Sequence, residues 1–260
     1  MKIVPLDKNF EALFWKHVNQ DIPHYYFFAF DWQHHRDKTK ILLALENEEI
    51  EGMMLVYDDR IAQLRGSSRA AEALLQRLDL EKVEFQSLKE HEQLVLEKYK
   101  PTLKQSHEMM LMLARRGEER LVTGCPVLAL DASDSEKIAT IMRDADPEFW
   151  GDVTDQGIVE GMGKGAEWFG VKVNDELVSI GNLRLTEWTG LIGIVATLEA
   201  HRNHGYATSI VSKIVKQILE TVPLAMIYVL ADNSPAVRAY TKAGFTPYRT
   251  YFFMRGAKKR

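Results

Sequence analysis

The sequence predicts an α/β fold in two similar halves, each a mixed β-sheet flanked by helices. Segments with the period of strands alternate with segments that carry the apolar stripe of a helix, and this order implies parallel strand pairs with helices packed on the sheet. Two glycine pairs, Gly66 with Gly205 and Gly117 with Gly256, share a separation of 139 residues. Because the element order of the two halves also matches, the sequence indicates an internal duplication.

Length and composition fit this division. At ~150 residues per domain, the 260 residues correspond to one large or two small domains. We place the boundary in the charged, aperiodic stretch 116–123, which gives domains 1–122 and 124–260. The net charge of −4 argues against a protein that binds nucleic acid through bulk charge. Cys125 is the only cysteine, so neither an internal disulfide nor a multi-cysteine metal site is expected.

Signals for membrane insertion or secretion are not expected either. The longest apolar stretches, 25–30 and 191–198, are far shorter than the ~20 residues of a membrane span. The N-terminal residues lack the apolar core of a signal peptide. We therefore expect a cytoplasmic protein without a membrane partner.

The second half carries the clearer pattern. Asn174 and Asp175 suit a tight turn between two strands, and the apolar residues of 207–219 recur four apart in two adjacent rows, as on one face of a helix. Ser234 suits the N-cap of a further helix, a proline follows it, and Gly244 comes just after the helix end. We expect strands at 126–130, 168–173, 177–183, 189–198 and 225–230, helices through 138–142, 155–162, 207–219 and 234–243, and final strands over 245–254.

The first half repeats this order in weaker form. We expect a hairpin of 39–45 with 51–57, then a strand at 61–65, a helix to 78, a strand at 83–88, a helix at 92–98 and a closing strand at 109–114.

The connection between the strand 189–198 and the following helix is a candidate anion site. The first turn of a helix exposes N–H groups without partners and carries the positive end of the helix dipole. Gly205 lacks a Cβ, so a phosphate can approach the main chain, Ala207 is small, and Arg202 offers a charged donor. Alternatively, Gly205 only lets the chain turn from strand to helix, because Arg-x-x-Gly-x-Ala alone is weak evidence.

A second motif follows 26 residues after Ala207, at Asn233. Arg202-x-x-Gly-Tyr-Ala207 is followed by Asn233-Ser-Pro-Ala-x-x-x-Tyr240-x-Lys-x-Gly-Phe245. This ordered pair resembles the GNAT superfamily of acyl-CoA N-acyltransferases, and Val195 to Ala207 is similar to the glycine N-acyltransferase-like branch. The resemblance covers roughly residues 126–255.

The resemblance implies tandem GNAT-like domains, of which 124–260 is the N-acetyltransferase, with acetyl-CoA as co-substrate. Each domain would have two splayed parallel central strands, and in the second domain 191–198 and 225–231 would splay apart around the pantetheine arm. Main-chain groups of Val195 and Thr197 would then pair with the pantetheine amides, the diphosphate would lie on the backbone of 202–208, and Asn233 would hydrogen-bond the arm. The implied cofactor-binding residues are Val195, Ala196, Thr197, Arg202, Asn203, His204, Gly205, Tyr206, Ala207, Thr208, Asn233, Ala236 and Tyr240.

The resemblance also implies a catalytic acid. Tyr240 would protonate the departing CoA thiolate, although outside this motif the residue would be interpreted as a core tyrosine that covers the sheet. The acceptor amine needs a base, but the family's glutamate early on the fourth strand is replaced here by Leu191 and Ile192. Glu187, Glu199 and His201 are neighbours in sequence and remain alternatives, with Glu199 taken as the catalytic candidate, beside a chain of water molecules or a weakly basic substrate.

The first half, 1–122, lacks this pair of motifs, so we interpret it as a degenerate GNAT-like domain without cofactor. The expected reaction is direct transfer of an acetyl or other acyl group to a small-molecule or peptide amine in a ternary complex. One alternative is a CoA-binding regulatory protein that has kept the fold and lost the base. Another is an interaction module in which side chains fill the cofactor cleft. No metal and no nucleic-acid partner are expected, and the sequence leaves open whether the chain forms a homodimer.

Overall fold

The computed structural model describes residues 1–102, 107–122 and 124–259, which form two units. The first unit contains 1–110, 230–232 and 249–260, and the second contains 111–229 and 233–248. This division differs from the expected boundary: residues 111–122 belong to the second unit, and the C-terminal residues belong to the first. Thr123, at the expected boundary, lies outside the described residues.

The first unit is built on a mixed sheet with the strand order β1-β2-β3-β4-β5-β13, in which β4 and β5 are parallel and β6 pairs with β13. Its buried apolar core lies between this sheet and the helices α3 and α4. The elements are β1 (Lys2–Pro5), α1 (Glu11–Val18), α2 (Ile22–His34), β2 (Thr39–Glu46), β3 (Glu49–Tyr57), β4 (Ile61–Gly66), α3 (Ser68–Leu75), β5 (Lys82–Leu88), α4 (Glu92–Lys98), β6 (Tyr99–Pro101) and the later part of β13 (Thr246–Lys258). The helix after β4 ends at Leu75, before the expected residue 78.

The C-terminal strand belongs to the first unit because its pairing and its burial are there. β13 pairs antiparallel with β5 from Tyr251 opposite Leu88 to Ala257 opposite Lys82. Tyr251 is fully buried, and Arg249 forms an ion pair with Asp21 of the same unit at 3.1 Å. The final strands expected over 245–254 are therefore one continuous strand.

The second unit has the strand order β7-β12-β11-β10-β9-β8. β11 and β12 are parallel, and β8, β9, β10 and β11 pair in antiparallel fashion. The elements are β7 (His107–Arg115, in this unit from Leu111), β8 (Leu128–Leu130), α5 (Ser135–Ala145), α6 (Pro147–Trp150), α7 (Asp155–Gly163), β9 (Ala166–Val173), β10 (Glu176–Leu185), β11 (Gly190–Thr197), α8 (Tyr206–Thr221), β12 (Leu224–Leu230) and α9 (Ser234–Lys242).

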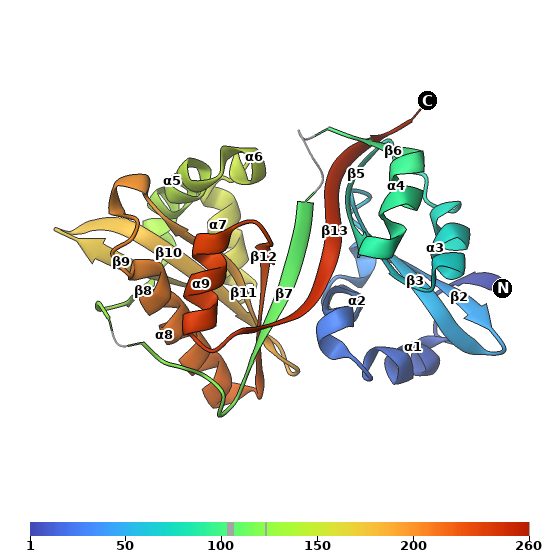
Figure 1. Ribbon diagram of the computed structural model, residues 1–260, viewed down its shortest axis with the longest axis horizontal. Coiled ribbons are helices and arrows are strands. Elements are labelled where there is room, and N and C mark those ends of the chain that lie inside the picture. The colour runs from blue at the N-terminus through green and yellow to red at the C-terminus, as the bar shows by residue number, and fades with distance from the viewer. Residues whose placement is uncertain (103–106, 123, 260) are drawn as a thin grey trace. The chain divides into compact units, whose positions relative to one another are not determined.

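Helices cover both faces of this second sheet (Figure 1). A Cβ built on Gly181 or Gly190 would collide with isoleucines of α8, so α8 packs closely on one face. On the other face, Ile194 and Ala196 join an apolar cluster with residues of α5 and α7. Among the described residues, no helix combines the length and the apolar character that crossing a membrane requires.

Candidate active site

The central feature of the second unit is a pair of parallel strands that pair over a short length only. β11 and β12 pair at Gly190 with Ala225, Leu191 with Met226 and Ile192 with Ile227. β11 continues to Thr197 and β12 to Leu230. Within the part of the chain that the structure describes, no β11–β12 pairing extends past Ile192, so the strands diverge from that residue on.

A β-bulge lies at the start of the divergence. Gly181 of β10 pairs with Val195 and Leu183 pairs with Ile192, so two residues of β11, Gly193 and Ile194, lie opposite Asn182. The Ile194 N–H donates to Asn182 Oδ1 at 2.8 Å. A bulge changes which edge of the strand the following N–H groups face, and this one is fixed by a side chain of the neighbouring strand.

The bulge leaves the main chain of Val195 and Thr197 facing β12. The Leu198 N–H donates to the Val178 carbonyl of β10, and hydrogen-bonded and non-bonded pairs alternate along antiparallel strands. Ala196 therefore also faces β10, while Val195 and Thr197 face the diverging side. The Thr197 carbonyl accepts a hydrogen bond from Arg202 Nε at 3.2 Å. The Val195 N–H and C=O and the Thr197 N–H are thus placed as the edge of a strand that an amide-bearing ligand can extend.

The helix α8 begins directly after this edge, with its first N–H groups uncapped. Gly205 is its N-cap, with a left-handed φ of +82°, and no side chain among the described residues caps the first turn. A Cβ built on Gly205 would meet no heavy atom of the described residues within 4 Å, so the space beside this N-cap is open. The N–H groups of Tyr206, Ala207 and Thr208 have no partner within the helix, which is the arrangement that binds anions.

Three polar residues precede Gly205 and are exposed: Arg202, Asn203 and His204. Asn203 has a left-handed φ of +66°. The His204 ring stacks on the Tyr206 ring, with centroids 5.6 Å apart, and its Nδ1 hydrogen-bonds the Arg202 carbonyl at 2.8 Å. Because a carbonyl only accepts, Nδ1 carries the proton. The loop thus presents donor groups at the N-terminus of α8.

The second motif forms the start of α9. Asn233 is the N-cap in place of the expected Ser234, and its Oδ1 accepts from the Ala236 N–H at 3.2 Å. Its Nδ2 is therefore the group left to bind a ligand. Ala236 is half-buried one turn before Tyr240. Tyr240 is only 6% exposed and lies edge-on to Phe245. Burial raises the pKa of the Tyr240 phenol well above its usual value, so the hydroxyl keeps its proton at neutral pH.

The expected base candidates lie at opposite ends of β11. Glu187 lies in the turn before the strand, whereas Glu199 and His201 lie in the 3₁₀ turn after it. At ~3.3 Å per residue, the eight-residue strand separates the two turns by ~23 Å. β11 itself carries no ionisable side chain. Glu199 and Glu187 are both exposed.

The corresponding elements of the first unit have a different geometry. β4 and β5 pair from Ile61 with Glu84 to Leu64 with Ser87, almost to the end of β4. A Cβ on Gly66 would lie 2.3 Å from the β3 backbone, and the single residue Ser67 that joins β4 to α3 caps the helix with its hydroxyl.

A buried side chain also lies at the end of β4. Arg65 is fully buried, with hydrogen bonds to Gln63 and Gln86 and its guanidinium 4.3 Å from the Tyr251 ring centre. In the first unit β4 and β5 stay paired, which differs from the splayed central strands expected in each half, and the N-terminus of α3 is already capped.

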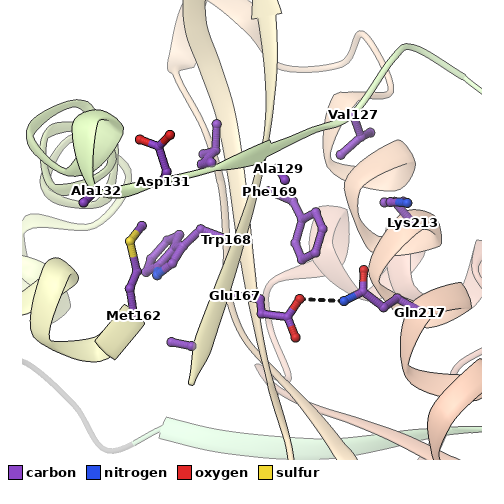
Figure 2. Close-up of a pocket in the computed structure, with 12 residues that line it drawn as sticks. Val127, Ala129, Asp131, Ala132, Met162, Glu167, Trp168, Phe169, Lys213 and Gln217 are labelled. Atoms are coloured by element: carbon purple, nitrogen blue, oxygen red, sulfur yellow. Dashed lines mark hydrogen bonds between the residues drawn. The ribbon is translucent and has the colours of Figure 1, made fainter. Parts of the chain in front are cut away.

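The structure also has a pocket of about 560 Å³ at the β8–β9 edge of the second unit. Figure 2 shows Trp168 and Met162 on one side of this pocket and Phe169 near Gln217 on the other, with a hydrogen bond from Gln217 to Glu167. None of the residues expected to bind a cofactor lines it. Among the described residues, no three histidine, cysteine or acidic side chains come together as metal ligands.

Comparisons with known proteins agree with this geometry. A family model described as FR47-like protein matches residues 170–254, and no curated protein matches the chain. Among solved structures, a GNAT-family acetyltransferase from Colwellia psychrerythraea is 14% identical with a TM-score of 0.58, and the match covers 100% of both chains. A Drosophila protein is 10% identical with a TM-score of 0.70, over 97% of this chain and 98% of that one.

A third similar structure is a tandem GNAT protein from the clavulanic acid biosynthesis pathway. It is 12% identical with a TM-score of 0.53, over 85% of this chain and 82% of that one. At these identities the similarity shows the fold alone. The expected mixed α/β fold with tandem GNAT-like architecture is confirmed.

Proposed function

We propose that the second unit is an acyl-CoA-dependent N-acetyltransferase of the GNAT superfamily, in its glycine N-acyltransferase-like branch. The observation that carries the proposal is the divergence of β11 and β12 after Ile192, with open main-chain groups on β11. The uncapped N-terminus of α8 directly follows that edge. The FR47-like match covers these same elements and supports the proposal.

Acetyl-CoA would bind as a continuation of the sheet. The pantetheine amides would pair with the Val195 C=O and the Thr197 N–H, and the diphosphate would accept hydrogen bonds from the N–H groups of 206–208 with Arg202 beside it. The dipole of α8 favours the same negative charge. Asn233 would donate from Nδ2 to the arm.

Transfer then requires the amine nitrogen to bond to the acyl carbon while the carbon–sulfur bond breaks. Charge that develops on the acyl oxygen would be stabilised by the Val195 N–H. Tyr240 would donate its proton to the departing thiolate. Burial holds the pKa of Tyr240 high. Tyr240 can therefore protonate the thiolate only if the thiolate lies in the same water-poor surroundings, which raise the pKa of the CoA thiol as well.

The proton of the amine would go to Glu199 or to water. We take Glu199, in the turn after β11, as the base candidate. Because it lies four residues past Val195, about 13 Å along an extended chain, it would receive the proton through water. The acceptor would be a small-molecule or peptide amine. The first unit would bind no coenzyme, which is supported by its continuous β4–β5 pairing and its capped α3.

A second function, CoA binding without catalysis, is favoured by one observation: β11 carries no ionisable side chain that could act as a base. Incubation with acetyl-CoA and a panel of amines, with detection of the released thiol, tests the enzyme. We expect thiol release that depends on the amine. If CoA raises the melting temperature but no amine supports release, the binding protein is the correct function; if CoA has no effect on melting, both fail.

A further inference from the structure

The bulge in β11 places one side chain, Asn182, at the point where the proposed reaction would take place. Asn182 lies on β10 opposite Gly193 and Ile194. A Cβ on Gly193 would lie 2.5 Å from Asn182 Oδ1 and 3.4 Å from Nδ2, so the amide group lies flat against this glycine. Gly193 is exposed although β11 is an inner strand, and it directly follows Ile192, the last residue paired with β12.

The orientation of the Asn182 amide is fixed. Its Oδ1 accepts the Ile194 N–H at 2.8 Å, and only the oxygen of the amide can accept from an N–H. The NH₂ group therefore points away from Ile194. In the described parts of the chain, no protein group accepts a hydrogen bond from Nδ2. The half-buried Asn182 amide is thus held through its oxygen, and the two N–H donors of its NH₂ group lie beside the exposed Gly193.

We propose that Asn182 donates a hydrogen bond from Nδ2 to the oxygen of the acyl group during transfer, together with the Val195 N–H. This inference rests on the proposed function. The acyl oxygen gains negative charge as the nitrogen–carbon bond forms and loses it when the carbon–sulfur bond breaks. A donor that is already held in place stabilises this charge without reorganising.

The substitution Asn182→Asp separates this role from a structural one. The aspartate keeps an oxygen for the Ile194 N–H, so the bulge and the fold are retained, but it has no NH₂ group to donate. We expect kcat to fall by about 10²–10³, the usual loss for one such donor, while the Kd for CoA, which has no acyl oxygen, changes less than about twofold. Asn174→Asp, in the exposed β9–β10 turn, makes the same change of charge and should leave kcat unchanged.

A measurement on the unsubstituted protein covers the case in which Asn182→Asp does not fold. The side-chain ¹⁵N–H₂ signals of Asn182, assigned by their loss in Asn182→Ser, should shift when acetyl-CoA replaces CoA without an acceptor amine. Only acetyl-CoA offers the acyl oxygen, so equal spectra with the two ligands overturn the inference.

The remaining outcomes are also decisive. If Asn182→Asp retains its kcat within about threefold, Asn182 does not contact the reacting oxygen. If it loses CoA affinity together with kcat, its role is structural and the inference also fails. Both results leave the proposed function intact, whereas a wild-type protein that neither binds CoA nor releases thiol removes the proposed function itself.

Discussion

Gly205→Ala tests whether the N-terminus of α8 binds the diphosphate. Gly205 has a φ of +82° and open space where a Cβ would lie, so alanine meets no steric obstacle. Its only cost to stability is the left-handed backbone, about 1–2 kcal/mol. The new methyl group would lie above the uncapped N–H groups and hinder the approach of a phosphate to them.

Gly205→Ala should lower the affinity for CoA as well as the stability, because the methyl group would displace a hydrogen bond to the diphosphate. Each hydrogen bond to a charged group contributes about 1.5–3 kcal/mol, so displacing one raises the Kd for CoA by about tenfold to a hundredfold. Isothermal titration calorimetry with CoA measures the Kd, and urea unfolding measures the stability.

The chain offers a matched control in Gly165, which follows α7. Its φ is +86°, and a Cβ there also meets nothing within 4 Å. Gly165→Ala should therefore lose the same stability as Gly205→Ala while its Kd for CoA stays at the wild-type value. If the two variants bind CoA equally well, the diphosphate does not lie on α8 and the proposed site is refuted.

Three further predictions concern other parts of the chain. Tyr240→Phe should lower kcat by about 10²–10⁴ with the Kd for CoA unchanged; steady-state kinetics with calorimetry checks this, and full turnover would exclude Tyr240 as the acid. A chain that ends at residue 248 loses Tyr251, Phe252 and Met254, which are all buried. At ~1.5–3 kcal/mol for each buried side chain, the loss is about 5–9 kcal/mol, whereas the free energy of unfolding of a domain is only about 5–15 kcal/mol. Circular dichroism should therefore show that the first unit no longer unfolds cooperatively, and a normal melt would contradict the assignment of β13 to that unit. Burial raises the pKa of Asp31 from 3.8 to about 7, so the folded state holds a proton that the unfolded state releases above pH ~4. Urea unfolding should therefore show stability falling as the pH rises from ~4 to ~7 and then levelling off. Asp31→Asn should remove this decline, and an unchanged pH profile would show that another group causes it.

Much of the candidate site could be predicted from local sequence. The Gly205 turn, the helix after it and a capped helix start near residue 234 depend on neighbours within a few residues, where residue type decides the conformation. The structure confirms the helix after Gly205 and a helix that begins at 234, but the N-cap of the latter is Asn233 and the expected Ser234 cap is wrong. Whether these residues bind a coenzyme stays a prediction.

The bulge and the place of the last strand were not predicted, for different reasons. A glycine inside a strand, such as Gly193, is a signal of a bulge, but Asn182 as its anchor depends on the register of a second strand. For β13, alternating apolar residues predict a strand without saying which sheet it joins. Its pairing partner β5 lies more than 150 residues earlier in the chain, and no local pattern encodes such a distance.

The assignment of β13 to the first unit has a consequence during synthesis. Ribosomes make a chain from its N-terminus, so β1 to β5 leave the exit tunnel long before residues 249–258 are translated. Until then β5 offers an open edge to any nascent strand or chaperone. The sheet of the first unit, whose strands β1 to β5 are translated first, is therefore completed last.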